Sequence, residues 1–547
     1  MPGREVGRVE TCVEGWEEGL DVGAVVVGAV AGAPSAANAM TKVARETIRW
    51  RCRNDLLTHP IMRAEWECVA IEFSSRPATE NRRQRQAGSE VTLDMVQSIL
   101  RSIFVTFFAM AALADDGNGL ARVARHEPEM SYLDNGVIRL GIDLKLGGAI
   151  TYLSKSDSQE NVVNSWDFGR QIQMSYYSGP VPFRVPGKEP KKEWRFIGWN
   201  PIQVGDAFGN SAKVLEHHND GKKLYVKCIP MHWPLDNVPG ECTFECWLEL
   251  DQAAVHARSR IVNNRPDHTK YPARGQELPA IYTNGPFYRL MTYTGDKPFT
   301  GDALSRIEKR KDEPGPWSSW IATESWSALV NDDSFGLGVW FPGGCGFAGG
   351  FAGNPGKGGP HDDPTGYLSP QSVEILDWNI AHEYRYDLML GNLEEMRKYV
   401  YAHATKPAPP AYRFNKDRQG WSYVHAVDTG WPIRGELNVL MEENDPKLIG
   451  PVGFWRAEDG GTVVVEAACH SGRNDSRLYW RRLSDAGFDD TRSESLALTS
   501  DGDFHTYRIK LSDHPNWKGP MTQLRFDPVG EGAKGDWIRI KSIEFEK

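Results

Sequence analysis

The alternation of apolar and polar side chains is the feature that most constrains how this chain can fold. Between residues 136 and 144, Ile138, Leu140, Ile142 and Leu144 share one face of an extended strand, and the charged residues Arg139 and Asp143 lie on the other. A period of two is typical of a half-buried β-strand. Similar runs recur at 149–153, 224–229, 242–250, 335–341, 462–467 and 505–511. Because a clear helical period occurs only at 392–403, the sequence predicts an all-β fold.

A proline-rich stretch divides the β pattern into two regions. Lys406 is followed by Pro-Ala-Pro-Pro, which ends the helical segment and is typical of a stiff linker. We therefore expect a first β domain over residues 127–405, a linker over 406–414 and a second β domain over 415–547. A second region of about 130 residues with short strands suits one β-sandwich or jelly roll.

An apolar segment lies well inside the chain rather than at its start. Residues 102–113 read SIFVTFFAMAAL, follow Arg101 and end in the small-residue sequence Ala112-Leu-Ala114. This pattern is typical of a secretory signal peptide, and it is shorter than the roughly 20 residues that span a membrane. We predict a signal peptide over 95–114 and a secreted, periplasmic or cell-surface protein. A buried core helix is the alternative.

The residues ahead of this segment show no persistent period of two or 3.6. They combine small apolar patches with arginine-rich stretches. We interpret residues 1–94 as an upstream extension that is either unstructured or not part of the true translated protein. No other segment predicts a membrane span.

Composition narrows the classes of partner. The chain has 63 Lys and Arg against 73 Asp and Glu, a net charge of −10, which argues against a nucleic-acid partner. It also has 19 Trp, and aromatic rings suit thick β-sheet cores or flat platforms for sugar rings. Five of the eight cysteines follow residue 114, without the spacing of a zinc site. We expect no metal, no cofactor and no protein partner.

Two parts of the sequence resemble known carbohydrate-related domains. Asn135-Gly-Val-Ile-Arg-Leu-Gly-Ile-Asp143, followed by Gly147-Gly-Ala-Ile-Thr-Tyr-Leu153, is similar to the first hairpin of galactose-mutarotase-like β-supersandwich domains. Residues 325–340 resemble the strand pair of those domains that turns at an acidic pair. The segments 502–508, 517–519, 524–528 and 537–540 resemble the end of a carbohydrate-binding jelly-roll module.

The resemblance implies a β-supersandwich followed by a smaller β-sandwich or jelly roll. Domains of the first kind occur in sugar epimerases and as parts of many glycosidases and polysaccharide lyases. Modules of the second kind are often appended to secreted enzymes that degrade polysaccharides. The expected partner is therefore a polysaccharide or an oligosaccharide. Because many chemistries use the first fold, the reaction has to be argued from individual residues.

Glu277 and Glu324 are the candidate carboxylic acids. Glu277 lies between a glycine and a proline with Tyr282 nearby. A carboxyl group held against an aromatic ring can have a raised pKa and donate a proton. Glu324 lies two residues before Trp326. Ordinary glycoside hydrolysis requires two carboxylates. Tyr282 and Trp326 are assigned to substrate binding, and a salt bridge at a strand end is the structural alternative for each acid.

His232 is the third candidate for acid–base chemistry. It follows a strand beside Trp233, between two prolines that stiffen its loop, and an imidazole exchanges protons near neutral pH. A histidine bonded to a backbone carbonyl is the alternative. Arg170, Gln173 and Tyr176 belong to a polar and aromatic run and are expected to bind sugar hydroxyls or a carboxylate. The alternative for the arginine is a structural pair with a neighbouring acid.

The second domain offers three aromatic residues that are candidate platforms for sugar rings. They are Tyr479, Trp480 and Trp517. Aromatic faces stack on the C–H faces of sugars, which would give the second domain a carbohydrate-binding role. The alternative places these side chains in the domain core.

Together these residues favour a secreted glycoside hydrolase that acts on a polysaccharide through carboxylate and histidine acid–base chemistry. A polysaccharide lyase is an alternative, with Arg170 neutralising a uronate carboxylate and His232 or Tyr282 as base. A mutarotase-like epimerase and a non-catalytic glycan-binding protein are the others. The second domain counts against the epimerase, because a free monosaccharide needs no anchor.

Overall fold

The structure is a computed structural model that describes residues 10–12, 68–70, 126–177, 185–197, 201–311, 313 and 316–546. The chain divides into two units, 1–90 and 91–547. In the first unit, β1 (Glu10–Cys12) pairs antiparallel with β2 (Cys68–Ala70). The predicted signal peptide over 95–114 lies outside the described residues, as does most of the predicted upstream extension. No helix among the described residues is long and apolar enough to cross a membrane.

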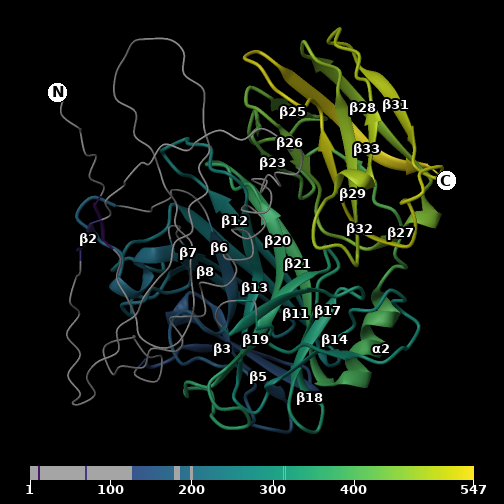
Figure 1. Cartoon of the computed structure of the whole chain (residues 1–547). Helices are drawn as coiled ribbons and strands as arrows, with labels where there is room; N and C mark the ends of the chain where they lie inside the picture. The colour runs from purple at the N-terminus through teal and green to yellow at the C-terminus, as the bar shows by residue number, and fades with distance from the viewer. Residues whose placement is uncertain are drawn as a thin grey trace. The chain divides into compact units, whose positions relative to one another are not determined.

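The second unit begins with a sandwich of two large antiparallel sheets (Figure 1). The path of the ten-stranded sheet runs through β16 (Trp317–Ile321), β19 (Gly346–Ala352), β20 (Thr365–Glu374), β13 (Arg274–Asn284), β6 (Ile172–Tyr177), β5 (Ala149–Lys155), β4 (Ile138–Asp143) and β3 (Met130–Asp134). Two short strands extend it beside β6, namely β7 (Pro201–Gln203) and β10 (Met231–His232).

The nine-stranded sheet faces the first through a shared hydrophobic core. Its order is β15 (Ser305–Arg306), β14 (Arg289–Thr292), β17 (Trp326–Val330), β18 (Phe335–Trp340), β21 (Ala381–Asn392), β12 (Ala254–Asn263), β11 (Cys242–Asp251), β9 (Lys223–Ile229) and β8 (Lys213–Asn219). Leu140 and Ile281 from one sheet and Phe244 and Leu388 from the other lie buried in that core. The alternation of apolar residues in 136–144 therefore places one face of β4 in the core, as expected for a period of two.

A second sandwich follows, coloured from green to yellow in Figure 1. One sheet holds β24 (Val427–Asp428), β25 (Leu437–Leu440), β33 (Trp537–Glu546), β28 (Thr462–His470) and β31 (His505–Lys510), with β22 (Tyr412–Arg413) beside β33. The other holds β23 (Ser422–Val424), β26 (Lys447–Ile449), β32 (Pro520–Asp527), β29 (Ser476–Arg482) and β30 (Ser493–Leu496), with β27 (Trp455–Arg456) beside β32. These sheets enclose a separate core.

The helix expected at 392–403 is α2 (Leu393–His403). Its amino end is closed by a capping box, in which Asn392 accepts a hydrogen bond from the Glu395 amide and Glu395 accepts one from the Asn392 amide. The expected fold class is confirmed: the described part of the chain is all-β, with a β-supersandwich followed by a smaller β-sandwich. β22, which lies within the predicted linker, pairs with the second sandwich.

Candidate active site

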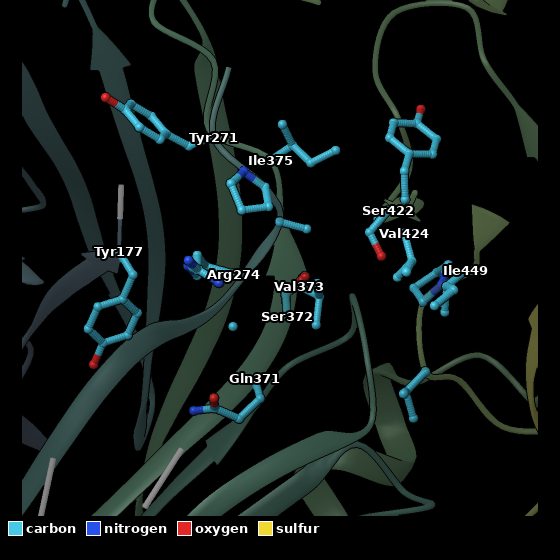
Figure 2. Close-up of a pocket in the computed structure, with 18 of the residues that line it drawn as sticks. Tyr177, Tyr271, Arg274, Gln371, Ser372, Val373, Ile375, Ser422, Val424 and Ile449 are labelled. Carbon is cyan, nitrogen blue, oxygen red and sulfur yellow. The ribbon is translucent and has the colours of Figure 1, made fainter. Parts of the chain in front are cut away.

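A cavity of about 730 Å³ lies in the second unit and takes its walls from both sandwiches. The first sandwich contributes Tyr177, Tyr271, Arg274, Glu277 and Gln371, among others. The second contributes Ser422, Val424, His425, Ile449 and Gln523, among others. Figure 2 shows members of the two walls on either side of an open space. This volume falls within the range of about 300–1,000 Å³ that is usual for ligand sites.

Glu277 reaches this cavity because of an irregularity in β13. On either side it pairs with Ser175 of β6 and Gln371 of β20. Directly after it, the register of β13 shifts against both neighbours. Pro279 lies in that interval and has no amide hydrogen for the ladder. Such bulges bend a strand and redirect its side chains. The sequence therefore places a carboxyl group in the middle of a sheet, on the face that borders the cavity.

The surroundings of Glu277 favour its protonated form. The side chain is only 6% exposed, and burial raises the pKa of Glu277 above its ordinary value, although hydrogen bonding with Tyr367, Ser175 and Tyr177 works against the shift. The Tyr367 hydroxyl donates to Oε1 at 2.5 Å. Within the described residues, the other oxygen, Oε2, has no hydrogen-bond partner. The tyrosine therefore holds the carboxyl in place through one of its two oxygens.

Two other carboxylates of the cavity wall are already neutralised. Arg418 Nη1 lies 2.7 Å from Asp377 Oδ2, and Arg418 Nε donates to Asp428 Oδ2 at 2.5 Å. All three side chains are buried. Because Asp377 follows the first sandwich's β20 and Asp428 belongs to β24 of the second, this arginine also joins the two walls. Among the described residues Glu277 has no cationic partner, whereas Asp377 and Asp428 share Arg418.

His425 brings a basic group to the opposite wall. Its Nδ1 atom is buried, and no group in the described part of the chain bonds to it. Its backbone has a φ of 52°, in the left-handed region that residues with a side chain seldom adopt. Strain of this kind occurs most often at functional sites. Sequence reasoning missed His425, along with Tyr177, Arg274 and Gln371, and no local motif marks them.

Arg170, Gln173 and Tyr176 do not line the cavity. The Arg170 guanidinium bonds to the Asp363 backbone oxygen at 2.5 Å and to its carboxylate at 2.9 Å. Gln173 donates to the backbone oxygen of Gly169. Tyr176 is buried, and its hydroxyl lies 3.1 Å from His382 Nδ1. The described contacts of all three are internal, as expected for the structural alternative.

His232 and Trp233 also lie away from Glu277. β10, which carries His232, pairs with β7, and β7 pairs with β6, so Glu277 lies three strands away, roughly 14 Å at the usual strand spacing. Burial lowers the pKa of His232 to about 4, which keeps the imidazole neutral near pH 7. Trp233 is buried against Trp194. The structure therefore does not bring the predicted histidine to the predicted acid.

The assignment of Glu324 as a second catalytic acid is corrected by its contacts. The side chain is fully buried and lies outside the cavity. It accepts hydrogen bonds from Arg397 of α2, from Trp326 Nε1 and from the Tyr401 hydroxyl. Burial acts to raise the pKa of Glu324, but these donors outweigh it and the pKa is lowered. Glu324 anchors α2, and Trp326 is a core residue rather than a sugar-binding one.

Tyr282 lies beside the site without lining the cavity. It packs 5.1 Å from the Tyr367 ring, which in turn lies 5.0 Å from Trp317. The three rings form a buried cluster behind the Glu277 carboxyl. Their apolar surfaces help to exclude water from that carboxyl, which is the effect that sequence reasoning expected of Tyr282.

The assignment of Trp480 and Trp517 as sugar platforms is also corrected. Trp480 is 0% exposed and Trp517 is 6% exposed, and the two rings pack edge to face in the core of the second sandwich. Neither can offer its face to a sugar. Tyr479 precedes Trp480 in β29 and therefore points to the outer side of the sheet, where the Arg525 guanidinium covers its ring at 4.3 Å.

Comparison with known proteins gives no match to a family model and no match to a curated protein. Among solved structures, a galactose mutarotase-like protein from Lactobacillus casei is similar at 12% identity, covering 48% of this chain and 100% of that one, with a TM-score of 0.30. A galactose mutarotase related enzyme from Lactobacillus acidophilus matches at 12% identity, 48% and 97% coverage and a TM-score of 0.30. A low-affinity xylan binding module from Roseburia intestinalis matches at 8% identity, 25% and 95% coverage and a TM-score of 0.19.

Proposed function

We propose that this protein is a glycan-active enzyme that hydrolyses glycosidic bonds, with Glu277 as the general acid. The observation that carries the proposal is the state of its carboxyl group. The residue lines the cavity, its side chain is buried and its pKa is raised. One oxygen is fixed by Tyr367, and the other has no hydrogen-bond partner within the described residues. A carboxyl group with a raised pKa beside a ligand site is suited to donate a proton.

In the proposed reaction, Glu277 Oε2 delivers its proton to the glycosidic oxygen as the bond to the anomeric carbon breaks. A water molecule then supplies hydroxide to that carbon, and its remaining proton is taken up by a base. We assign that role to His425, because the residue lines the same cavity and its buried Nδ1 has no hydrogen-bond partner within the described residues. The free acid is restored when the proton returns to Glu277 through solvent. Arg274 and Gln371 supply donors for sugar hydroxyls.

A polysaccharide lyase is the second candidate, and one observation favours it. Arg274 lines the cavity together with Glu277 and Tyr177, and a guanidinium can neutralise the carboxylate of a uronate so that its neighbouring proton becomes acidic. In this reaction the sugar ring gains a double bond instead of a water molecule. The product therefore distinguishes lyase from hydrolase.

The test incubates the full chain with a panel of polysaccharides and measures both reducing ends and the absorbance of unsaturated uronates. Reducing ends alone support the hydrolase, and both signals together support the lyase. Neither signal with any glycan refutes both, and leaves an epimerase or a glycan-binding protein.

Glu277→Gln preserves the shape of the side chain but removes its proton, so it should lower the rate by about 10²–10⁴-fold, the usual contribution of a general acid. The matched control is Glu324→Gln, a buried acid outside the cavity. We expect that variant to lose stability while its folded fraction keeps the wild-type rate. Near-full activity of Glu277→Gln would remove Glu277 from the mechanism.

A further inference from the structure

The outer side of β29 presents two arginines in a row. Trp480 of this strand points into the core, so Arg477, Tyr479 and Arg481 point to the opposite side. Both arginines are half-buried. Arg481 Nε donates to the backbone oxygen of Asp485 at 3.1 Å. Arg477 Nη1 donates to the Ser493 hydroxyl at 3.1 Å.

Neither of these two guanidinium groups forms an ion pair with a carboxylate within the ranges that the structure describes. Other arginines of the second sandwich do form them: Arg508 pairs with Glu546, and Arg473 pairs with Asp475. Burial also lowers the pKa of Arg481. Partly desolvated charge is costly unless an opposite charge compensates it. The nearest acids already have other partners, since Asp527, opposite Arg477, pairs with Arg525, and Asp485, near Arg481, pairs with Arg482 and Arg492. The two cations on this face point to an anionic ligand.

This outer face continues into the wall of the proposed active-site cavity. Arg481 pairs across the strands with Gln523, and Arg525 pairs with Ile449. Gln523 and Ile449 both line the cavity, and Figure 2 shows Ile449 on its second wall. Residues directly opposite in an antiparallel pair point to the same side, with Cβ atoms about 5 Å apart. A chain that leaves the cavity along this sheet therefore meets Arg481 at the next strand.

We propose that the outer face of β32 and β29 binds the acidic groups of an anionic polysaccharide whose chain enters the Glu277 cavity. The proposal rests on the proposed function for the identity of the ligand as a glycan, and it adds the charge of that glycan. Arg477 and Arg481 are the contacts, through carboxylates of uronates or sulfate half-esters. The second sandwich then selects the substrate as well as forming part of the cavity wall.

The test measures binding to the full chain carrying Glu277→Gln, so that a hydrolase would not consume the ligand. The probes are polygalacturonate for carboxylates, dextran sulfate for sulfates, unsubstituted dextran as the neutral chain, and a DNA duplex as another polyanion. Affinity electrophoresis is run with Arg477→Gln/Arg481→Gln added. The matched control adds Arg473→Gln/Arg508→Gln, which removes the same charge from residues that are already paired.

We expect one or both acidic glycans to bind more tightly than dextran and DNA. The double substitution Arg477→Gln/Arg481→Gln should weaken this binding by about tenfold for each arginine, because the loss of one hydrogen bond to a charged group changes a dissociation constant by about that factor. The control pair should leave it within about twofold of the parent, as expected for exposed ion pairs. Equal binding of dextran, equal binding of DNA, or unchanged binding after the double substitution would overturn the proposal. Failure of Glu277 in the hydrolysis assay would leave this binding result unaffected, so the two proposals fail separately.

Discussion

Arg418 provides a direct test of how the two walls of the cavity are held together. Its side chain is 4% exposed and lies 2.7 Å from Asp377 and 2.5 Å from Asp428, both of them buried. Arg418→Met keeps much of the length of the side chain but leaves two carboxylates in the interior without a counter-charge. Removing one partner of a buried ion pair usually costs about 3–5 kcal/mol. We expect a loss of that size in the free energy of unfolding near pH 7.

Urea unfolding followed by tryptophan fluorescence compares the wild type with Arg418→Met and with the triple variant Arg418→Met/Asp377→Asn/Asp428→Asn. Because the cost comes from unpaired charge, the triple variant should recover most of the loss. The reasoning is refuted if Arg418→Met unfolds at the wild-type urea concentration, or if the triple variant is as unstable as the single one.

Glu277, Trp480 and the segment 95–114 each carry a further prediction. Burial raises the pKa of Glu277 above 4.5, so the contribution of Glu277 to stability is most favourable below that value and is lost as pH rises through the raised pKa of the folded protein. The melting temperature of Glu277→Gln should therefore rise relative to that of the wild type as pH rises. A difference between the two melting temperatures that does not change with pH would contradict this. Trp480→Ala should lower the free energy of unfolding in urea by about 3–5 kcal/mol, as expected for a ring in the core. If Trp480→Ala loses less stability than Trp480→Phe, the ring does not belong to the core. We also predict export with cleavage near the end of segment 95–114, and mass spectrometry of exported protein that still carries residues 1–94 would refute this.

Much of the fold could be predicted because local patterns determine it. The period of two that places Leu140 inward in β4 depends only on neighbouring residues. The start of α2 could likewise be predicted from the capping residue Asn392, and its end from the prolines that follow the helix. Both patterns hold wherever the strand or the helix packs, so no knowledge of distant contacts was needed.

The alternation of side chains in β29 already indicated in the sequence which of its residues point into the core. Leu478 and Trp480 alternate with the more polar Arg477, Tyr479 and Arg481. Adjacent residues of a strand point to opposite faces, so Tyr479 and Trp480 cannot both be surface platforms. The apolar partner of Trp480 already favoured the inward position for the tryptophan.

The cavity itself could not be predicted from local patterns. Glu277 could be proposed from its sequence neighbours, but its pKa depends first on burial and then on partners such as Tyr367, which belongs to another strand. The opposite wall comes from the second sandwich, including His425. Only the tertiary contacts, such as those of Arg418 with Asp377 and Asp428, bring these segments together.

These contacts change how the second sandwich should be understood. A carbohydrate-binding module on a stiff linker would be expected to act as a separate anchor. Here Arg418 of that sandwich is buried against Asp377, and Lys270 of the first sandwich donates to the Asp428 backbone oxygen. Residues 422–428 and 449–452 also form one side of the cavity that holds the Glu277 carboxyl. Because low polarity around a carboxyl group raises its pKa, a wall that limits water in this cavity also helps to keep the acid protonated. The second sandwich therefore contributes to the proposed acid chemistry through its packing, in addition to any sugar that its outer face binds.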